Sequence, residues 1–211
     1  TNEDLIFVEC GYDQTMVIKQ VGNYKYRYVC GRNNAGQLGN NDGAFANVLY
    51  PVLQDWGQNP LIKIACGEQH CIVLLDEGKA FSFGLNTSGQ LGHGDVVSPH
   101  IHPTIGAQIG SYTDITNIAC GQYHSAIIRS NGGGTLYTFG KNSSGQLGDG
   151  TTTDRSSPTL ISGHTGVIDV KCGQSFTIFL NSDGSLYSFG YNIDGQLGRA
   201  LNYSSFIATI G

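Results

Sequence analysis

The nine residues Gly140-Lys-Asn-Ser-Ser-Gly-Gln-Leu-Gly148 have three counterparts in the chain, which begin at Gly31, Gly84 and Gly190. All four follow the pattern Gly-x-Asn-x-x-Gly-Gln-Leu-Gly, and successive copies start 50 to 56 residues apart. A pattern that returns at this period is typical of repeat architectures such as β-propellers. We therefore expect the repeated residues to build the frame, and function to depend on what differs between the copies.

Short apolar segments precede each copy and indicate β-strands. Around the third copy, residues 118–120 and 125–129 are apolar runs, and residues 136–139 alternate in the manner of a strand. Asn131-Gly132 lies between the last two segments and is typical of a tight hairpin turn. Pro158 follows the motif in an extended segment, where an edge strand is expected because proline cannot donate to a sheet.

The predicted fold is therefore all-β. It is a β-propeller of four-stranded antiparallel blades, because helix patterns are nearly absent and each period of about 50 residues has room for one small sheet. The predicted blades span approximately residues 5–60, 61–114, 115–166 and 167–211.

The Gly-Gln-Leu-Gly part of the motif is predicted to be structural. Its glycines suit a sharp loop in which backbone approaches backbone, and its leucine is expected to fill an apolar gap. Its glutamine is expected to be satisfied by backbone groups of the adjoining repeat, because a buried amide without partners is costly. The predicted structural residues are Gly36, Gln37, Gly39, Gly89, Gln90, Gly92, Gly145, Gln146, Gly148, Gly195, Gln196 and Gly198.

Four of the six cysteines recur once per repeat, each directly before a glycine; they are Cys10, Cys66, Cys120 and Cys172. Equivalent positions in neighbouring units usually lie too far apart for a disulfide, and a thiol packs well as a small buried hydrophobe. We therefore expect reduced, unreactive cysteines and an intracellular protein, either cytoplasmic or nuclear.

The composition excludes several classes of function. With 39% hydrophobic and 13% charged residues the chain is expected to fold, and no apolar run is long enough to span a membrane. The net charge is −5 and the basic residues are scattered, so direct binding of nucleic acid is not expected. The phosphate-loop, zinc-helix and nucleophile-elbow motifs are absent, so no catalytic residue, cofactor or metal is predicted.

A second signature, Cys-Gly-x-x-His, alternates with the first. It is complete from Cys66 to His70 and from Cys120 to His124, whereas Gln14 and Phe176 replace the histidine in the first and fourth repeats. With both signatures, the chain resembles the regulator of chromosome condensation repeat family over nearly its whole length. The histidines are predicted to bond neighbouring backbone rather than to act as acids or bases.

The resemblance implies a seven-bladed ring, of which four repeats are present here. We expect this chain to be part of a longer protein; the alternative is an open ring whose exposed edge strands meet something else. The family includes exchange factors for the small GTPase Ran, domains of large ubiquitin ligases, and adaptors.

The leading functional hypothesis is a non-catalytic scaffold that binds a protein partner, either a small GTPase or a larger assembly. Specificity is expected in the inter-repeat segments 40–60, 93–114 and 149–167, which share little sequence. Aromatic anchors are common at interfaces, although Trp56 packed under its own loop is the alternative. The candidate partner-binding residues are Tyr50, Asp55, Trp56, His100, His102, Asp154 and Arg155. His100 and His102 alone would make a poor metal site, and Asp154 and Arg155 also suit a solvated surface.

The second hypothesis is guanine-nucleotide exchange on a Ran-like GTPase. In the family this activity resembles the action of a wedge, in which a β-hairpin inserted in one blade disturbs the nucleotide site. Successive Cys-Gly elements lie 52 to 56 residues apart, so no repeat carries such an insertion. This near-uniform spacing favours the scaffold.

Overall fold

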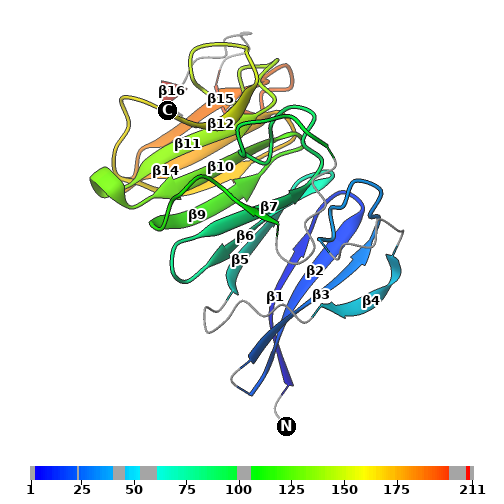
Figure 1. Ribbon diagram of the computed structural model, residues 1–211. Helices are drawn as coiled ribbons and strands as arrows, with labels where there is room; N and C mark the ends of the chain where they lie inside the picture. The colour runs from blue at the N-terminus through cyan, green and yellow to red at the C-terminus, as the bar shows by residue number, and fades with distance from the viewer. Residues whose placement is uncertain are drawn as a thin grey trace.

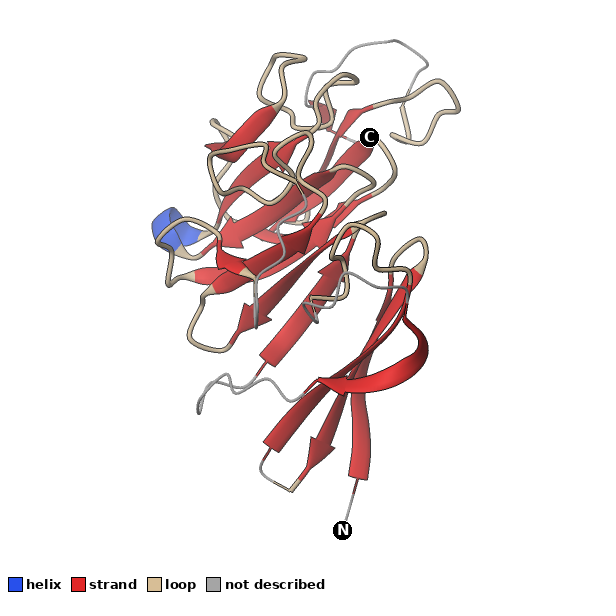
Figure 2. Cartoon of the chain, turned by 45° about the vertical axis from the view of Figure 1, so that its right-hand side comes forward, coloured by secondary structure: helices blue, strands red, loops and turns tan. Residues whose placement is uncertain are grey.

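Four antiparallel sheets of four strands each make up the part of the chain that the structure describes, which confirms the predicted all-β propeller architecture. The computed structural model describes residues 3–22, 24–39, 46–52, 61–98, 106–199 and 208–209. Figure 1 shows the sheets following one another in chain order, from blue to orange. Figure 2 shows strands joined by loops, with one short helical turn, η1 (Asn131–Gly133), in the described part of the chain.

Each sheet is a meander in which every strand pairs with the next one in the sequence. Blade 1 consists of β1 (Glu3–Cys10), β2 (Gln14–Val21), β3 (Tyr24–Gly31) and β4 (Ala46–Val52). Blade 2 consists of β5 (Leu61–Cys66), β6 (His70–Leu75), β7 (Ala80–Gly84) and β8 (Ala107–Gln108). Blade 3 consists of β9 (Ile115–Cys120), β10 (His124–Arg129), β11 (Thr135–Gly140) and β12 (Arg155–Leu160). Blade 4 consists of β13 (Val167–Cys172), β14 (Phe176–Asn181), β15 (Leu186–Gly190) and β16 (Ala208–Thr209).

The sequence signatures mark the connections at one end of every blade. The Cys-Gly turn joins the first and second strands, and the Gly-Gln-Leu-Gly corner follows the third strand. The two connections touch in each blade; in blade 3, for example, the amide of Lys141 donates to the carbonyl of Tyr123 at 2.8 Å. We call this the loop end. The turns between second and third strands lie at the opposite end, because antiparallel strands reverse direction.

The strand predictions around the third copy are confirmed, but its hairpin turn is wider than predicted. Asn131-Gly132 does not form a two-residue turn, because three consecutive glycines have positive φ angles of 62°, 83° and 109° at Gly132, Gly133 and Gly134. The run of glycines allows a longer loop built on η1. Pro158 lies within the outer strand β12, as expected for a residue that cannot donate to a ladder.

Among the described residues, the apolar core is divided into three clusters, each between adjacent blades. Strand β6 contributes to two of these clusters. Val73 and Leu75 pack in the cluster shared with blade 1, whereas Ile72 and Leu74 pack in the cluster shared with blade 3. Alternate side chains of a strand point to opposite faces, so an inner blade is apolar on both faces. The repeat leucines Leu38, Leu91, Leu147 and Leu197 have no exposed surface, which confirms their predicted role as apolar plugs.

The fourth blade is buried on one face. Phe179 and Phe189 pack into the cluster shared with blade 3, whereas Ile178, Leu180 and Leu186 remain half-buried on the other face. Among the described residues, no fifth sheet covers these side chains.

One charged side chain lies in the core between blades 1 and 2. Arg27 is 1% exposed, and its guanidinium lies over the ring of Phe83, with 5.0 Å between Cζ and the ring centroid. Nη2 donates to the carbonyl of Gly39 at 3.1 Å, but Nε and Nη1 have no hydrogen-bond partner in the described part of the chain. Burial lowers the pKa of Arg27 to about 10, so the group is still charged at neutral pH. Blades 3 and 4 carry Leu136 and Leu186 at the same position before the strand-ending glycine.

We therefore expect Arg27→Met to raise the free energy of unfolding by about 1–2 kcal/mol, because a flexible apolar side chain would replace a buried charge that lacks a counterion. Urea denaturation at neutral pH measures the change. Arg32→Met is the control, since Arg32 is 40% exposed and its pair with Asp13 is long at 3.5 Å. A loss of stability in Arg27→Met greater than in Arg32→Met would show that the guanidinium contributes favourably to this core.

Candidate protein-interaction surface at the loop end

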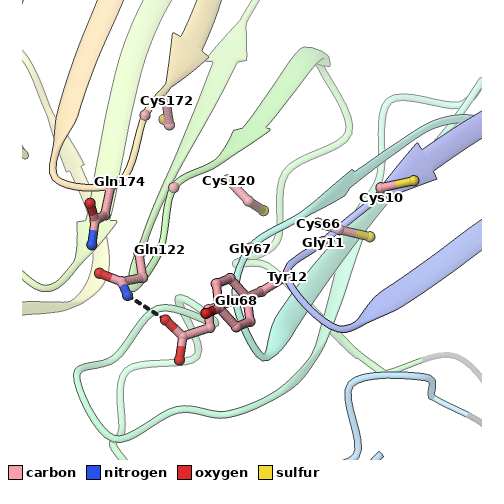
Figure 3. Close-up of a pocket in the computed structure, with 12 residues that line it drawn as sticks. Cys10, Gly11, Tyr12, Cys66, Gly67, Glu68, Cys120, Gln122, Cys172 and Gln174 are labelled. Carbon is pink, nitrogen blue, oxygen red and sulfur yellow. Dashed lines mark hydrogen bonds between the residues drawn. The ribbon is translucent and has the colours of Figure 1, made fainter. Parts of the chain in front are cut away.

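The Cys-Gly turns of all four blades line one cavity of about 490 Å³ at the loop end. Figure 3 shows its four cysteines in succession along the inner edges of the blades. The lining residues are Cys10, Gly11, Tyr12, Cys66, Gly67, Glu68, Cys120, Gly121, Gln122, Cys172, Gly173 and Gln174. The first strands therefore converge, and we call this space the axial cavity. All six cysteines of the chain are free thiols.

Hydrogen bonds between successive turns form the mouth of the axial cavity. The amide of Glu68 donates to the carbonyl of Gln122, and the amide of Gln122 donates to the carbonyl of Gln174, both at 3.2 Å. The carboxylate of Glu68 accepts from Nε2 of Gln122, as Figure 3 shows, and from the hydroxyl of Tyr123 at 2.7 Å. The bond to Glu68 raises the pKa of Tyr123. The mouth is thus polar and mutually braced, and sequence reasoning did not identify Glu68.

A second polar chain crosses the first strands of blades 2 to 4. Lys63 donates to Oδ1 of Asn117, Nδ2 of Asn117 donates to Oδ1 of Asp169 at 2.8 Å, and Lys171 donates to the same oxygen at 2.9 Å. Burial lowers the pKa of Lys63. Burial alone would raise the pKa of Asp169, but the bonds from Lys171 and Asn117 outweigh it and lower the pKa.

The signature histidines join each blade to the next. Nε2 of His70 lies 2.9 Å from Oγ of Ser125, and that hydroxyl donates to the carbonyl of Gln90 at 2.8 Å. His124, Thr177 and the carbonyl of Gln146 repeat the arrangement with two distances of 2.9 Å. Because the hydroxyl proton is used on the carbonyl, the network assigns the imidazole proton to Nε2.

For the Nε2 atoms these contacts differ from the expected bonds to backbone, because the partners are hydroxyl side chains of the following blade. Both rings have no exposed surface. Burial lowers the pKa of His70 to about 3 and that of His124 to about 4, so both are neutral at pH 7. Closed off from solvent and bonded internally, they hold blades together and are not placed for acid–base chemistry.

The glutamines of the Gly-Gln-Leu-Gly corners also differ from expectation. Their Oε1 atoms accept from a backbone amide two residues earlier in the same corner, at 2.8–3.0 Å, and not from the adjoining blade; the pairs are Gln37 with Ala35, Gln90 with Ser88, Gln146 with Ser144, and Gln196 with Asp194. The glutamine backbone makes the contact between blades instead, through the carbonyls of Gln90 and Gln146.

In blades 2 and 3, the asparagine of the corner anchors the variable loop that follows. In blade 3, Nδ2 of Asn142 donates to Oδ1 of Asp149 at 3.0 Å, and its backbone amide donates to Oδ1 of Asp154 at 2.7 Å. Arg155 pairs with Asp149 at 2.7 Å. Burial alone would raise the pKa of Asp149, but the hydrogen bonds from Thr151 and Arg155 outweigh it and lower the pKa, so the carboxylate form is stabilised. Asp154 and Arg155 therefore each hold the loop in place.

The other predicted partner-binding residues are only partly located. Tyr50 lies in β4, where its backbone is opposite Val29. Asp55, Trp56, His100 and His102 lie outside the described residues.

Several exposed apolar side chains lie in the connections of the loop end; Val96 and Val97 belong to the variable segment 93–114, whereas Tyr12, Tyr191 and Ile193 were not predicted. Tyr12 is 77% exposed, Val96 and Val97 are 58% and 63% exposed, and Tyr191 and Ile193 are 41% and 49% exposed. The last two line a hollow of about 270 Å³ between the corners of blades 3 and 4, together with Ser143, Ser144 and Thr152. A comparison of the repeats could have identified Tyr191 and Ile193, because these two positions of the motif vary between copies. The corner of blade 3 carries Lys141 and Ser143 there.

The connections at the opposite end have a different character. Between second and third strands, the described turns consist of glycine and polar residues; they are Gly22, Asp76 to Lys79, Ser130 to Gly134, and Asn181 to Ser185. The two ends of the blades thus differ in chemistry, and the loop end is the more apolar of the two sets of connections.

The described part of the chain carries no cluster of three or more His, Cys, Asp or Glu side chains suited to a metal ion. Within the same residues, no helix has the length and apolar character needed to cross a membrane.

Together, the blades and their braced loop end define a repeat protein of the β-propeller class. The chain belongs to the Regulator of chromosome condensation (RCC1) repeat family, which matches residues 28–74, 77–128 and 133–180. A second description of the same repeat matches residues 61–90, 115–146 and 167–196.

Comparison with known proteins gives related chains that are longer. The chain is 39% identical over 148 residues to the probable E3 ubiquitin-protein ligase HERC4 of Rattus norvegicus, covering 68% of this chain and 13% of that protein. It is 39% identical over 137 residues to the protein RCC2 homolog of Danio rerio, covering 63% of this chain and 26% of that protein. The crystal structure of yeast RCC1 (Prp20), solved with Kap60, has a TM-score of 0.80 at 21% identity; the match covers 100% of this chain and 49% of that one.

Proposed function

We propose that this chain is a non-catalytic binding scaffold whose partner is a protein held at the loop end. The observation that carries the proposal is the contrast between two sets of side chains. Polar groups of the repeat, such as Nε2 of His70, Nε2 of His124 and Oδ1 of Asn142, form bonds inside and between blades. The apolar residues Tyr191 and Ile193 are exposed beside a hollow at the same end.

Interfaces favour aromatic and aliphatic anchors on a rigid support. Two loops of this end, in blades 2 and 3, have such support, because a corner asparagine donates to a carboxylate of the loop in each. Tyr191 is further positioned by its own backbone amide, which donates to the carbonyl of Ser175 at 2.9 Å. A partner would therefore meet a surface that needs little ordering on binding, which favours affinity.

A double variant tests the proposal with residues that the fold already accepts. Tyr191→Lys with Ile193→Ser gives the corner of blade 4 the residues of blade 3, so the fold should be kept. We expect the amount of specific partner recovered by the immobilised protein to fall about tenfold, which corresponds to loss of about 1.4 kcal/mol of binding free energy. Quantitative mass spectrometry of proteins captured from the native source measures it.

The matched control is Ile62→Thr, because Ile62 is 46% exposed at the start of β5, away from the loop end, and blade 3 carries Thr116 at its position. Its captured proteins should equal those of the unmodified chain. Equal losses in both variants, or none in the double variant, would remove the loop end as the binding surface. Release of labelled GDP from a Ran-like GTPase is measured in parallel, since acceleration would favour the exchange-factor alternative over a scaffold.

A further inference from the structure

We propose that Cys66 and Cys71 form a site of reversible oxidation, which closes to an intrachain disulfide when hydrogen peroxide reaches the axial cavity. The two Sγ atoms lie 2.9 Å apart, although both residues are free thiols. A disulfide joins sulfurs at about 2.05 Å, so a movement of less than an ångström would bring the pair to bonding distance.

The register of the strands favours the bond. Cys66 and Cys71 are directly opposite each other on the antiparallel strands β5 and β6. The next pair, Gly67 and His70, is hydrogen-bonded, with 2.8 Å from the amide of Gly67 to the carbonyl of His70. The cysteines therefore occupy a non-hydrogen-bonded pair, where Cα atoms lie about 4.5 Å apart. That separation falls within the range that disulfides tolerate.

Blade 2 is distinguished from the other three blades by this second thiol. Cys10 and Cys172 face the hydroxyls of Thr15 and Thr177, with Sγ to Oγ1 distances of 3.9 and 3.8 Å. Cys120 is opposite Ser125 in the same register. Among the four described blades, a thiol replaces the hydroxyl in blade 2 alone.

The replacement also frees Cys71 from the bonding that holds the hydroxyls. Ser125 and Thr177 are each bonded to a histidine and to a backbone carbonyl. Cys71 instead receives a long contact of 3.8 Å from Nε2 of Gln14, which bonds the carbonyl of Gly67 at 3.0 Å. Gln14 thus keeps a partner when the sulfur moves, so crosslinking costs the junction of blades 1 and 2 little.

Access decides which sulfur reacts first. Cys66 lines the axial cavity, whereas Cys71 has no exposed surface. The thiolate of Cys66 attacks one oxygen of the peroxide and breaks the O–O bond; the products are a sulfenic acid and, with the thiol proton, one water. The sulfur of Cys71 then attacks the sulfenic sulfur, and the S–O bond breaks as the second water leaves. Two thiols thus lose two protons and two electrons, and one peroxide becomes two waters.

The reaction is expected to be slow at neutral pH and faster at high pH. The hydrogen bond with Cys71 and burial raise the pKa of Cys66 well above that of an ordinary thiol. The thiolate is the attacking species, so the rate should rise about tenfold per pH unit between pH 7 and 8.5.

Treatment of the reduced full chain with hydrogen peroxide tests the site. The exposed thiol of Cys10 is first removed by Cys10→Ser to prevent crosslinks between chains. After remaining thiols are alkylated, peptide mapping should show Cys66 joined to Cys71, formed at least tenfold faster than Cys120 or Cys172 is oxidised, and opened again by dithiothreitol. Loss of thiols elsewhere while Cys66 and Cys71 stay alkylated would overturn the proposal.

Three variants separate the pair from general oxidation. Cys71→Ser copies the arrangement of blade 3 and should abolish the crosslink, leaving a sulfenic acid at Cys66 that dimedone traps. Cys120→Ser should keep the crosslink. Thr15→Cys, in a chain that retains Cys10, should add a second crosslink at the equivalent position of blade 1. If Cys66 instead formed a disulfide with another cysteine in the Cys71→Ser variant, the short distance between Cys66 and Cys71 would not be what selects the disulfide, and the proposal would fail.

Discussion

Gly121→Ala should lower the free energy of unfolding by about 3 kcal/mol or more. The reason is that the imidazole of His124 packs directly against Gly121, where a side chain would otherwise lie. A β-carbon at Gly121 would lie 2.1 Å from Cε1 of His124 and 2.6 Å from the carbonyl oxygen of Gly173. The ring of His124 is buried and bonded to Thr177, so it cannot turn away without breaking the contact between blades 3 and 4. Urea denaturation or loss of soluble protein at 37 °C measures the effect.

Gly163→Ala is the control for this substitution. Gly163 has a φ of +84°, but a β-carbon there would meet no atom within 4 Å. It should cost about 1 kcal/mol from backbone strain alone. Gly121 does not have a positive φ, so a cost no greater than that of Gly163→Ala would contradict the role of the glycine as space for the imidazole.

Acid should destabilise the protein through the same histidines. In the unfolded chain a histidine takes up a proton near pH 6.5, whereas folding lowers the pKa of His70 to about 3 and that of His124 to about 4. Between these values the unfolded state binds more protons, so the free energy of unfolding falls as the pH falls below 6.5. From pH 7 to pH 5 the loss should be about 2 kcal/mol per histidine, or about 4 kcal/mol for both.

The double variant His70→Gln with His124→Gln isolates this effect. Glutamine occupies the position in blade 1 and can still donate to a hydroxyl, but it does not titrate. Urea denaturation at pH 7 and pH 5 should give nearly equal stabilities for the variant and a difference of several kcal/mol for the unmodified chain. A variant as sensitive to acid as the parent would place the pH dependence in other groups, such as the carboxylates of Asp149 and Asp169.

The candidate surface was only partly accessible to sequence reasoning. The variable segments were recognised as the place where specificity would lie, and loop 149–155 does belong to the loop end. The exposed Tyr191 and Ile193 were missed because they lie inside the repeated signature, which was interpreted as structural throughout. A comparison of the variable positions between copies would have found them.

The pair Cys66 and Cys71 was also not recognised from the sequence. Cysteines at equivalent positions of different repeats are too far apart for a disulfide, and on that ground all six are expected to be unreactive. Cys66 and Cys71 belong to one repeat, however; four residues separate them, and a tight turn places them opposite each other. That pairing was available from hairpin register alone.

What the sequence by itself determined is the repeated antiparallel sheet, because turn glycines, strand alternation and edge prolines act between residues close together in the chain. Tertiary structure alone decided how those sheets are joined. His70 and Ser125 are 55 positions apart, and the burial of Arg27 depends on Phe83 of another blade. Such contacts form when apolar faces are pressed together and buried polar groups must find partners on the neighbouring sheet. No local pattern specifies which partner they find.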